Sequence, residues 1–252
     1  MSGWVNSRER TDQTVFDFLN HEESAFAFDK IVAFVNDAKF SKKRLISRSA
    51  RYSGLMDKLD FIEAESEGSL PTLAQLEGIT SWVVNAEEDI SVIAKVASLV
   101  QESSVENVSI LYSGAQSLSD VSEAKEALAA LEGLGDGTAY SLIAVGAITE
   151  EPEGKMPYAI QEFGTEEGLL PSNATYSRDE SLRLVTECLG LASGANKALV
   201  FSEVSNVNAT EFKLVKGLRE GGYTRPQEID HMISKGVEVS GILHPIIVQF
   251  VD

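Results

Sequence analysis

Apolar runs of strand length alternate along this chain with stretches in which apolar residues recur at helical spacing. The runs predict buried strands at Ile31–Val35, Ser81–Asn85, Val108–Tyr112, Tyr140–Val145 and Ala198–Phe201. The helical stretches between them lie at residues 90–100, 121–134 and 178–191. Strands that alternate with helices form right-handed crossovers and pair mainly in parallel. The pattern therefore predicts an α/β fold with a doubly wound, mainly parallel sheet and helices on both faces.

Weaker patterns fill the rest of the chain. They predict a strand at Asp60–Glu65, a helix through Leu70, Leu73 and Leu76 that ends at Gly78, and a short extended piece near Tyr158. We expect three parts: an N-terminal lead-in segment at residues 1–29, a Rossmann-like domain at residues 30–208, and a tail at residues 209–252 with helical and extended pieces packed on that domain. Residues 1–13 are polar and contain no apolar signal-peptide core. If the protein works in an organelle, we therefore expect its targeting segment to have been removed already.

The stretch Lys30–Leu45 has the outline of a first strand, turn and helix of a nucleotide-binding sheet. A dinucleotide at such a turn needs glycines for the tight turn, for close approach of the backbone to the pyrophosphate, and for packing of helix on strand. The three glycine places fall on Asn36, Lys39 and Lys42. We therefore expect a closed phosphate turn and no bound cofactor, although Lys39, Lys42, Lys43 and Arg44 offer charges to a phosphate.

Charge is unevenly spread along the chain. A net charge of −18 argues against a nucleic-acid-binding surface over the whole molecule. Residues 39–58 nevertheless contain seven basic residues and one acid. This stretch is either a solvated helix face or a contact patch for an anionic partner, and the candidate contact residues are Lys39, Lys42, Lys43, Arg44, Arg48 and Arg51. No apolar run approaches the ~18 residues of a membrane span.

Cysteine and histidine offer little chemistry. Cys188 is the only cysteine, which excludes an intrachain disulfide and favours a reducing compartment. It lies in an apolar helical pattern without a nearby histidine, so we expect a buried structural thiol rather than a nucleophile. His21, His231 and His244 are isolated, and no pair has metal-ligand spacing on one helix.

Several segments, taken in order, resemble the atypical short-chain dehydrogenase/reductase family, which has an NAD(P)-binding Rossmann fold. They are Leu59–Glu65, Leu73–Ile79 with Trp82–Val84, Glu106–Ser113, Tyr140–Gly146, and Tyr176–Glu180 with Ala195–Lys197. The resemblance covers about residues 30 to 203. Asp17–Glu23 before Ile31–Val35, together with Ala139–Ile143, is most similar to the plastid thylakoid proteins of the transcriptionally-active-chromosome group.

The resemblance places Ser113 on the family's catalytic serine and Lys125 on its lysine, but Val121 stands where the catalytic tyrosine is expected. Ala144 and Val145 replace the family's usual Arg-Pro. Without a phenol, no acid is present to protonate a carbonyl during hydride transfer. Tyr112 is adjacent to Ser113, but strand alternation directs it to the other face.

These losses lead us to predict a pseudoenzyme with neither catalytic residues nor cofactor. It would serve as a binding module, a subunit or an assembly factor. The resemblance implies the plastid stroma, peripheral to the thylakoid membrane, with photosystem I as the predicted partner. The alternative is an NADP-dependent reductase of the same family that uses the basic stretch.

Overall fold

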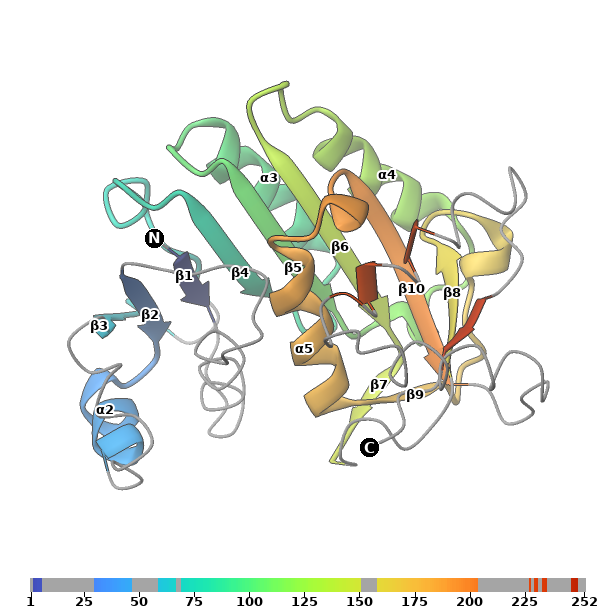
Figure 1. Ribbon diagram of the computed structural model, residues 1–252, viewed down its shortest axis with the longest axis horizontal. Helices are drawn as coiled ribbons and strands as arrows, with labels where there is room; N and C mark the ends of the chain where they lie inside the picture. Colours follow the sequence, from blue (N-terminus) through green and yellow to red (C-terminus); the bar gives the residue numbers. More distant parts are fainter. Residues whose placement is uncertain are drawn as a thin grey trace.

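The computed structural model describes residues 2–5, 30–46, 59–66, 69–150, 158–203, 227, 229–230, 233–234 and 246–248. Its main feature is a nine-stranded sheet in the order β11-β8-β10-β6-β5-β4-β1-β2-β3 (Figure 1). In chain order the strands are β1 (Ser2–Val5), β2 (Ile31–Val35), β3 (Leu59–Glu63), β4 (Ser81–Asn85), β5 (Asn107–Tyr112), β6 (Ala139–Val145), β8 (Tyr158–Glu162), β10 (Lys197–Glu203) and β11 (Ile246–Val248). All neighbours from β6 to β3 pair in parallel, as do β10 and β6, whereas β8 runs antiparallel to β10 and to β11. The predicted doubly wound α/β fold is confirmed.

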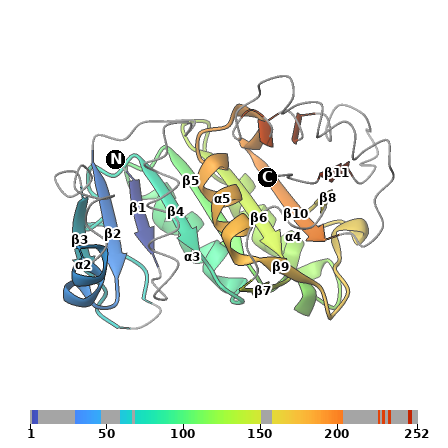
Figure 2. The same cartoon turned by 60° about the horizontal axis from the view of Figure 1, so that its bottom comes forward.

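Helices cover both faces of the sheet. Helices α3 (Ser91–Gln101) and α4 (Ser122–Glu132) pack side by side on one face, and α5 (Arg178–Cys188) lies across β5 and β6 on the other. Strand alternation divides the core accordingly, because Leu111 packs in the cluster that contains α5 and Tyr112 in the cluster that contains α3. Helix α2 (Ala38–Ile46) lies at the β3 end of the sheet, away from α5 (Figure 2).

The strand order corrects our assignment of the first unit. Strand β1 lies between β2 and β4, with Val5 level with Phe34 on one side and Val84 on the other. Ile31–Val35 is therefore a buried strand, as predicted, but it is the second strand and not the first. Strand β1 was not predicted, because its four residues are too few to show a period. Residues 6–29 and the predicted helix at 209–220 lie outside the described residues.

Smaller differences concern local elements. The helix expected through Leu70, Leu73 and Leu76 is a hydrogen-bonded turn at residues 73–78, confined between Pro71 and the left-handed Gly78 (φ 72°). A separate parallel pair, β7 (Ala147–Thr149) with β9 (Thr175–Ser177), was not predicted either. Within the described part of the chain, no helix is long and apolar enough to cross a membrane.

Candidate active site

The order of the strands places the candidate site at one edge of the sheet. The chain proceeds from β1 through β2 to β3 and then returns to the other side of β1 as β4, so the strand order reverses between β1 and β4. In open α/β sheets, ligands bind outside the carboxyl ends of the strands at such a switch point. A pocket of about 440 Å³ lies at this edge, where β4, β5 and β6 end. It is lined by Asn85, Glu87, Glu88, Leu111, Ser113, Ala147, Ile148, Glu150, Arg178 and Leu182.

Backbone hydrogen bonds join the ends of β4 and β5 on one wall of the pocket. The Ala86 N–H donates to the Leu111 carbonyl (2.8 Å), and the Ser113 N–H donates to the Glu87 carbonyl (2.7 Å). Glu87 has a φ of 50°, a left-handed conformation that is uncommon for residues other than glycine, and its N–H donates to the Asn85 Oδ1 (3.1 Å). Strained residues of this kind cluster at functional sites. These bonds fix the backbone of Ser113, a residue that is 6% exposed, at the pocket wall.

The opposite wall comes from β7 and the start of α5. Ser177 caps α5, because its Oγ accepts from the Glu180 N–H (3.4 Å). The first helical residue, Arg178, lines the pocket, and its Nη1 donates to the Glu150 Oε1 (2.8 Å). Gly146 permits this arrangement, because a Cβ there would overlap the Ala174 carbonyl that precedes β9.

The residues taken from the family resemblance do not all meet in this pocket. Ser113 does, and its neighbour Tyr112 points to the other face as expected, where its ring meets Phe163 edge-on at 6.2 Å between centroids. Burial, followed by the charges of Glu123, Asp89 and Glu88, raises the Tyr112 pKa to about 12. Val121 precedes α4 and Lys125 lies exposed beside Gly164, and neither lines the pocket. The identities of Val121 and Lys125 therefore do not determine whether this pocket can catalyse a reaction.

Sequence reasoning missed most of the lining. Asn85 and Glu87 follow a buried strand, and the rule of carboxyl ends would have identified them once β4 was placed beside β1. Arg178 appeared only within a resembling motif. No pattern in the sequence around Arg178 indicates that β9 places this residue at the ends of β5 and β6.

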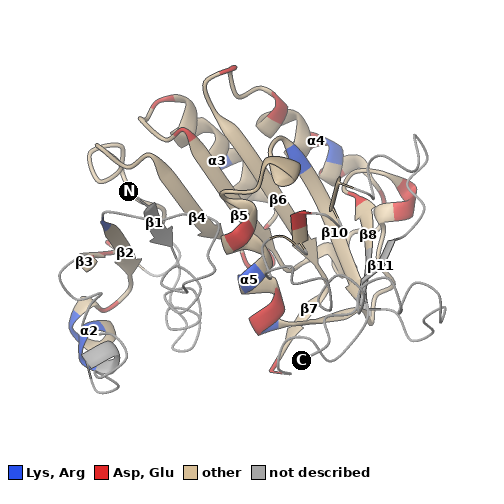
Figure 3. Cartoon of the chain, viewed as in Figure 1, with Lys and Arg blue, Asp and Glu red and all other residues tan. Residues whose placement is uncertain are grey.

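The basic residues proposed as partner contacts follow β2. Lys39, Lys42 and Lys43 are exposed on α2, and Figure 3 shows basic residues on this helix at the β3 end of the sheet. Arg44 belongs to α2, whereas Arg48 and Arg51 lie outside the described residues. Whether these residues contact a partner stays a prediction.

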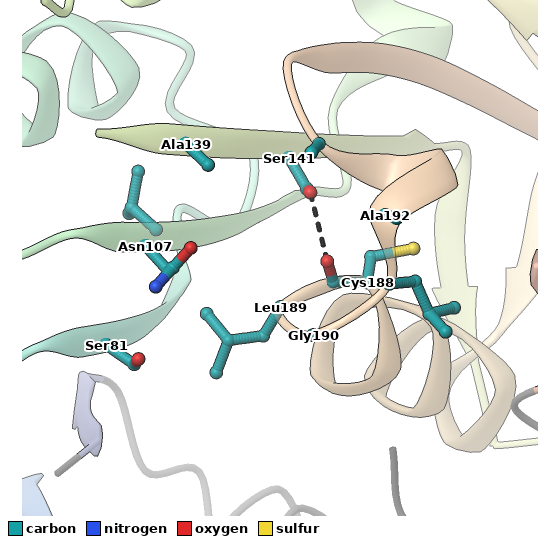
Figure 4. Close-up of a pocket in the computed structure, with 11 residues that line it drawn as sticks. Ser81, Asn107, Ala139, Ser141, Cys188, Leu189, Gly190 and Ala192 are labelled. Carbon is teal, nitrogen blue, oxygen red and sulfur yellow. Dashed lines mark hydrogen bonds between the residues drawn. The ribbon is translucent and has the colours of Figure 1, made fainter. Parts of the chain in front are cut away.

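A second pocket, of about 380 Å³, lies at the opposite edge, where β4, β5 and β6 begin. Figure 4 shows Ser81 and Asn107 on one side and Leu189 on the other, with the Ser141 Oγ donating to the Cys188 carbonyl (3.2 Å). Burial, with Glu187 and Asp230, raises the Cys188 pKa to about 12, so the thiol stays protonated at neutral pH. The expected burial of this thiol is confirmed. No group of metal-ligating side chains occurs among the described residues.

Comparison with known proteins agrees with this topology. No family model and no curated protein matches the sequence. A short-chain dehydrogenase/reductase from Veillonella parvula, solved in complex with NADP, is similar in structure, with a TM-score of 0.51 and 14% identity over 81% of this chain and 94% of that one. A putative epimerase from Bacteroides thetaiotaomicron has a TM-score of 0.52 and 11% identity over 82% and 98%. The chain shares the doubly wound fold of these two proteins.

This result corrects our prediction of a non-enzymatic protein. That prediction required a phosphate turn blocked by Asn36, Lys39 and Lys42, but these residues follow the second strand. The phosphate turn of this fold follows β1, and residues 6–29 lie outside the described part. The fold is also that of a protein solved with NADP. The argument that Asn36, Lys39 and Lys42 close the cofactor site therefore fails, although the stretch after β1, residues 6–29, contains no glycine either.

Proposed function

We propose that this protein is an NADP-dependent oxidoreductase that acts on a small carbonyl or alcohol substrate at the carboxyl ends of β4, β5 and β6. The main support is the pocket beside the reversal of strand order, with Ser113 in its wall. The volume of about 440 Å³ suits a small molecule, since ligand pockets span roughly 300–1,000 Å³.

The end of β2 favours NADP over NAD. In this fold an acid near the second strand binds the ribose hydroxyl of NAD, whereas a cation accommodates the 2′-phosphate of NADP. Asp37 is engaged as the cap of α2, because its Oδ1 accepts from the Phe40 N–H (2.8 Å). Lys39, Lys42 and Lys43 are exposed on the helix that follows. The residues therefore fit a 2′-phosphate.

Within the pocket, two donors suit a substrate that carries a carbonyl group. NADPH, when bound, supplies a hydride. The Ser113 hydroxyl would stabilise the negative charge that develops on the substrate oxygen, in place of the absent tyrosine, and the Arg178 guanidinium would hold the substrate beside it. Water supplies the proton that completes the alcohol. Fixed donors in a buried site are effective because they need no reorganisation as the charge develops.

The test is a titration of the purified protein with NADPH and with NADH, followed by nucleotide fluorescence. We expect saturable binding of NADPH in the micromolar range and at least tenfold weaker binding of NADH. Replacing both Lys39 and Lys42 by Glu should abolish this preference. Lys95→Glu, an exposed substitution on α3, is the matched control and should leave the preference unchanged. Failure to bind either nucleotide would refute the proposal.

The plastid location and the association with photosystem I stay predictions. Both rest on the resemblance of Asp17–Glu23 and Ala139–Ile143 to a thylakoid group. Washing isolated thylakoids in rising salt, with native gels to detect comigration with photosystem I, tests them, because attraction between exposed charges is screened beyond ~8 Å at physiological ionic strength.

A further inference from the structure

Arg178 is an unusual group in the pocket at the carboxyl ends of the strands. It is the only cation among the described lining residues, which also include the acids Glu87, Glu88 and Glu150. Its side chain is 15% exposed, so most of the guanidinium is removed from water. A charge so placed must be compensated by partners.

The partners that Arg178 has are incomplete. Nη1 donates to Glu150 at 2.8 Å, and Nη2 reaches the Asp179 Oδ1 only at 3.4 Å. The Nε–H is buried and has no hydrogen-bond partner in the described part of the structure. A buried donor without an acceptor costs about 1–3 kcal/mol, and such a group requires an explanation. Because the covered Nε is closed to a ligand, a further carboxylate can reach only the Nη atoms, which bind a carboxylate end-on through two parallel hydrogen bonds.

Glu150 is the partner most easily exchanged. It follows β7, and its side chain is 65% exposed. Only the Glu150 end of this pair is exposed, so its carboxylate can turn into water provided that another carboxylate compensates the largely buried Arg178. Another carboxylate could then take its place without changing the net charge around Arg178.

We propose that the pocket recognises a substrate with a single carboxylate, which displaces Glu150 and binds Arg178. This inference rests on the proposed oxidoreductase function and names its substrate class, a small oxo monocarboxylate whose carbonyl lies near Ser113. A second negative charge on the substrate would face the carboxylates of Glu87 and Glu88, so we expect substrates that carry only one negative charge. Glu150 thus occupies the place of the substrate carboxylate when the pocket is empty.

The test measures binding without turnover, on the full chain without nucleotide. The probes are pyruvate, levulinate (4-oxopentanoate) and phenylglyoxylate, compared with 4-oxopentanamide as the neutral counterpart of levulinate and with 2-oxoglutarate as a dianion. Ligand-observed NMR titrations give the dissociation constants. We expect at least one monocarboxylate to bind at least tenfold more tightly than the amide and the dianion.

Two variants identify the residues. Arg178→Gln should weaken binding of the monocarboxylate at least tenfold and leave the amide unchanged. Glu150→Gln leaves Arg178 intact and should strengthen binding of the monocarboxylate several-fold, because the competing carboxylate is gone. Glu126→Gln, an exposed acid on α4, is the matched control and should have no effect.

The result that overturns the proposal is the absence of saturable monocarboxylate binding in both the wild type and Glu150→Gln. Equal binding of levulinate and its amide would also overturn it. The nucleotide titration is independent of these measurements. Loss of NADPH binding with intact carboxylate recognition would refute the oxidoreductase function alone, whereas NADPH binding without carboxylate recognition would refute only the substrate class.

Discussion

Two residues other than glycine have left-handed backbone conformations in the described part of the chain, Glu87 (φ 50°) and Asn196 (φ 55°). Asn196 precedes β10 and holds the end of the sheet opposite the candidate site. Its N–H donates to the Tyr140 carbonyl (2.7 Å), and its Oδ1 accepts from the Tyr140 N–H (3.3 Å). Asparagine tolerates this conformation better than most residues, so its identity here follows from backbone geometry.

Two substitutions of Asn196 therefore distinguish the cost of backbone strain from the cost of a lost hydrogen bond. Asn196→Ala should destabilise the protein by about 2 kcal/mol, because it loses the side-chain acceptor and keeps an unfavourable conformation. Asn196→Gly should cost only about 1 kcal/mol, because glycine adopts the conformation freely. Urea unfolding followed by circular dichroism measures both losses. Equal losses would show that the conformation carries no strain.

Cys188 makes stability depend on pH. Its folded pKa of about 12 lies above the ordinary 9.0, so the unfolded chain releases a proton that the folded protein retains. The stabilisation is complete below pH 9 and is lost as the pH rises toward 12. Between pH 9 and 10 the free energy of unfolding should fall by about 1 kcal/mol more in the wild type than in Cys188→Ala. Above pH 10 Tyr112, with a pKa raised to about 12 from 10.0, adds the same dependence, so the comparison belongs below that pH.

At the scale of elements, β9 connects the fold to the candidate site. It pairs with β7 and leads directly into α5, and Gly146 lets the Ala174 carbonyl approach the end of β6. Gly146→Ala should displace β9 and the start of α5, destabilise the protein by about 1–3 kcal/mol, and weaken any ligand held by Arg178. Thermal unfolding and the NMR titration measure the two effects. Gly135→Ala is the control, because a Cβ there has open space within 4 Å.

The elements that sequence reasoning predicted are those with a long period and a buried face. Strands β4, β5, β6 and β10 and helices α3 to α5 follow from their apolar patterns, with ends shifted by at most three residues. Short strands such as β1 and β7 have too few residues for a period, and only pairing with distant segments creates them. Because β1 was not predicted, Ile31–Val35 was taken as the first strand instead of the second. Ser113 was found by resemblance, whereas Arg178 and Glu150 meet only through tertiary structure.

For the whole molecule, β1 is the strand on which both halves of the parallel sheet depend. It joins β2 and β3 on one side to β4 and the strands beyond on the other. Its partner β4 lies far from it in the sequence, at Ser81–Asn85. A lead-in segment outside the sheet, as the sequence suggested, would tolerate a proline. A strand paired on both sides would not, because proline lacks the N–H that the ladder requires.

Trp4→Pro therefore tests the topology that places the candidate site. We expect a loss of at least about 2 kcal/mol in the free energy of unfolding, together with weaker NADPH binding, because β1 and β4 flank the switch point. Trp4→Val is the matched control, since valine favours strands and keeps the N–H, so any loss that it shows comes from the side chain alone. Urea unfolding of the three proteins measures the difference. If Trp4→Pro were as stable as Trp4→Val, the backbone of residue 4 would lie outside the hydrogen-bonded sheet. Ile31–Val35 would then regain its place as the first strand of a smaller sheet, and the reversal of strand order that locates the pocket would be lost.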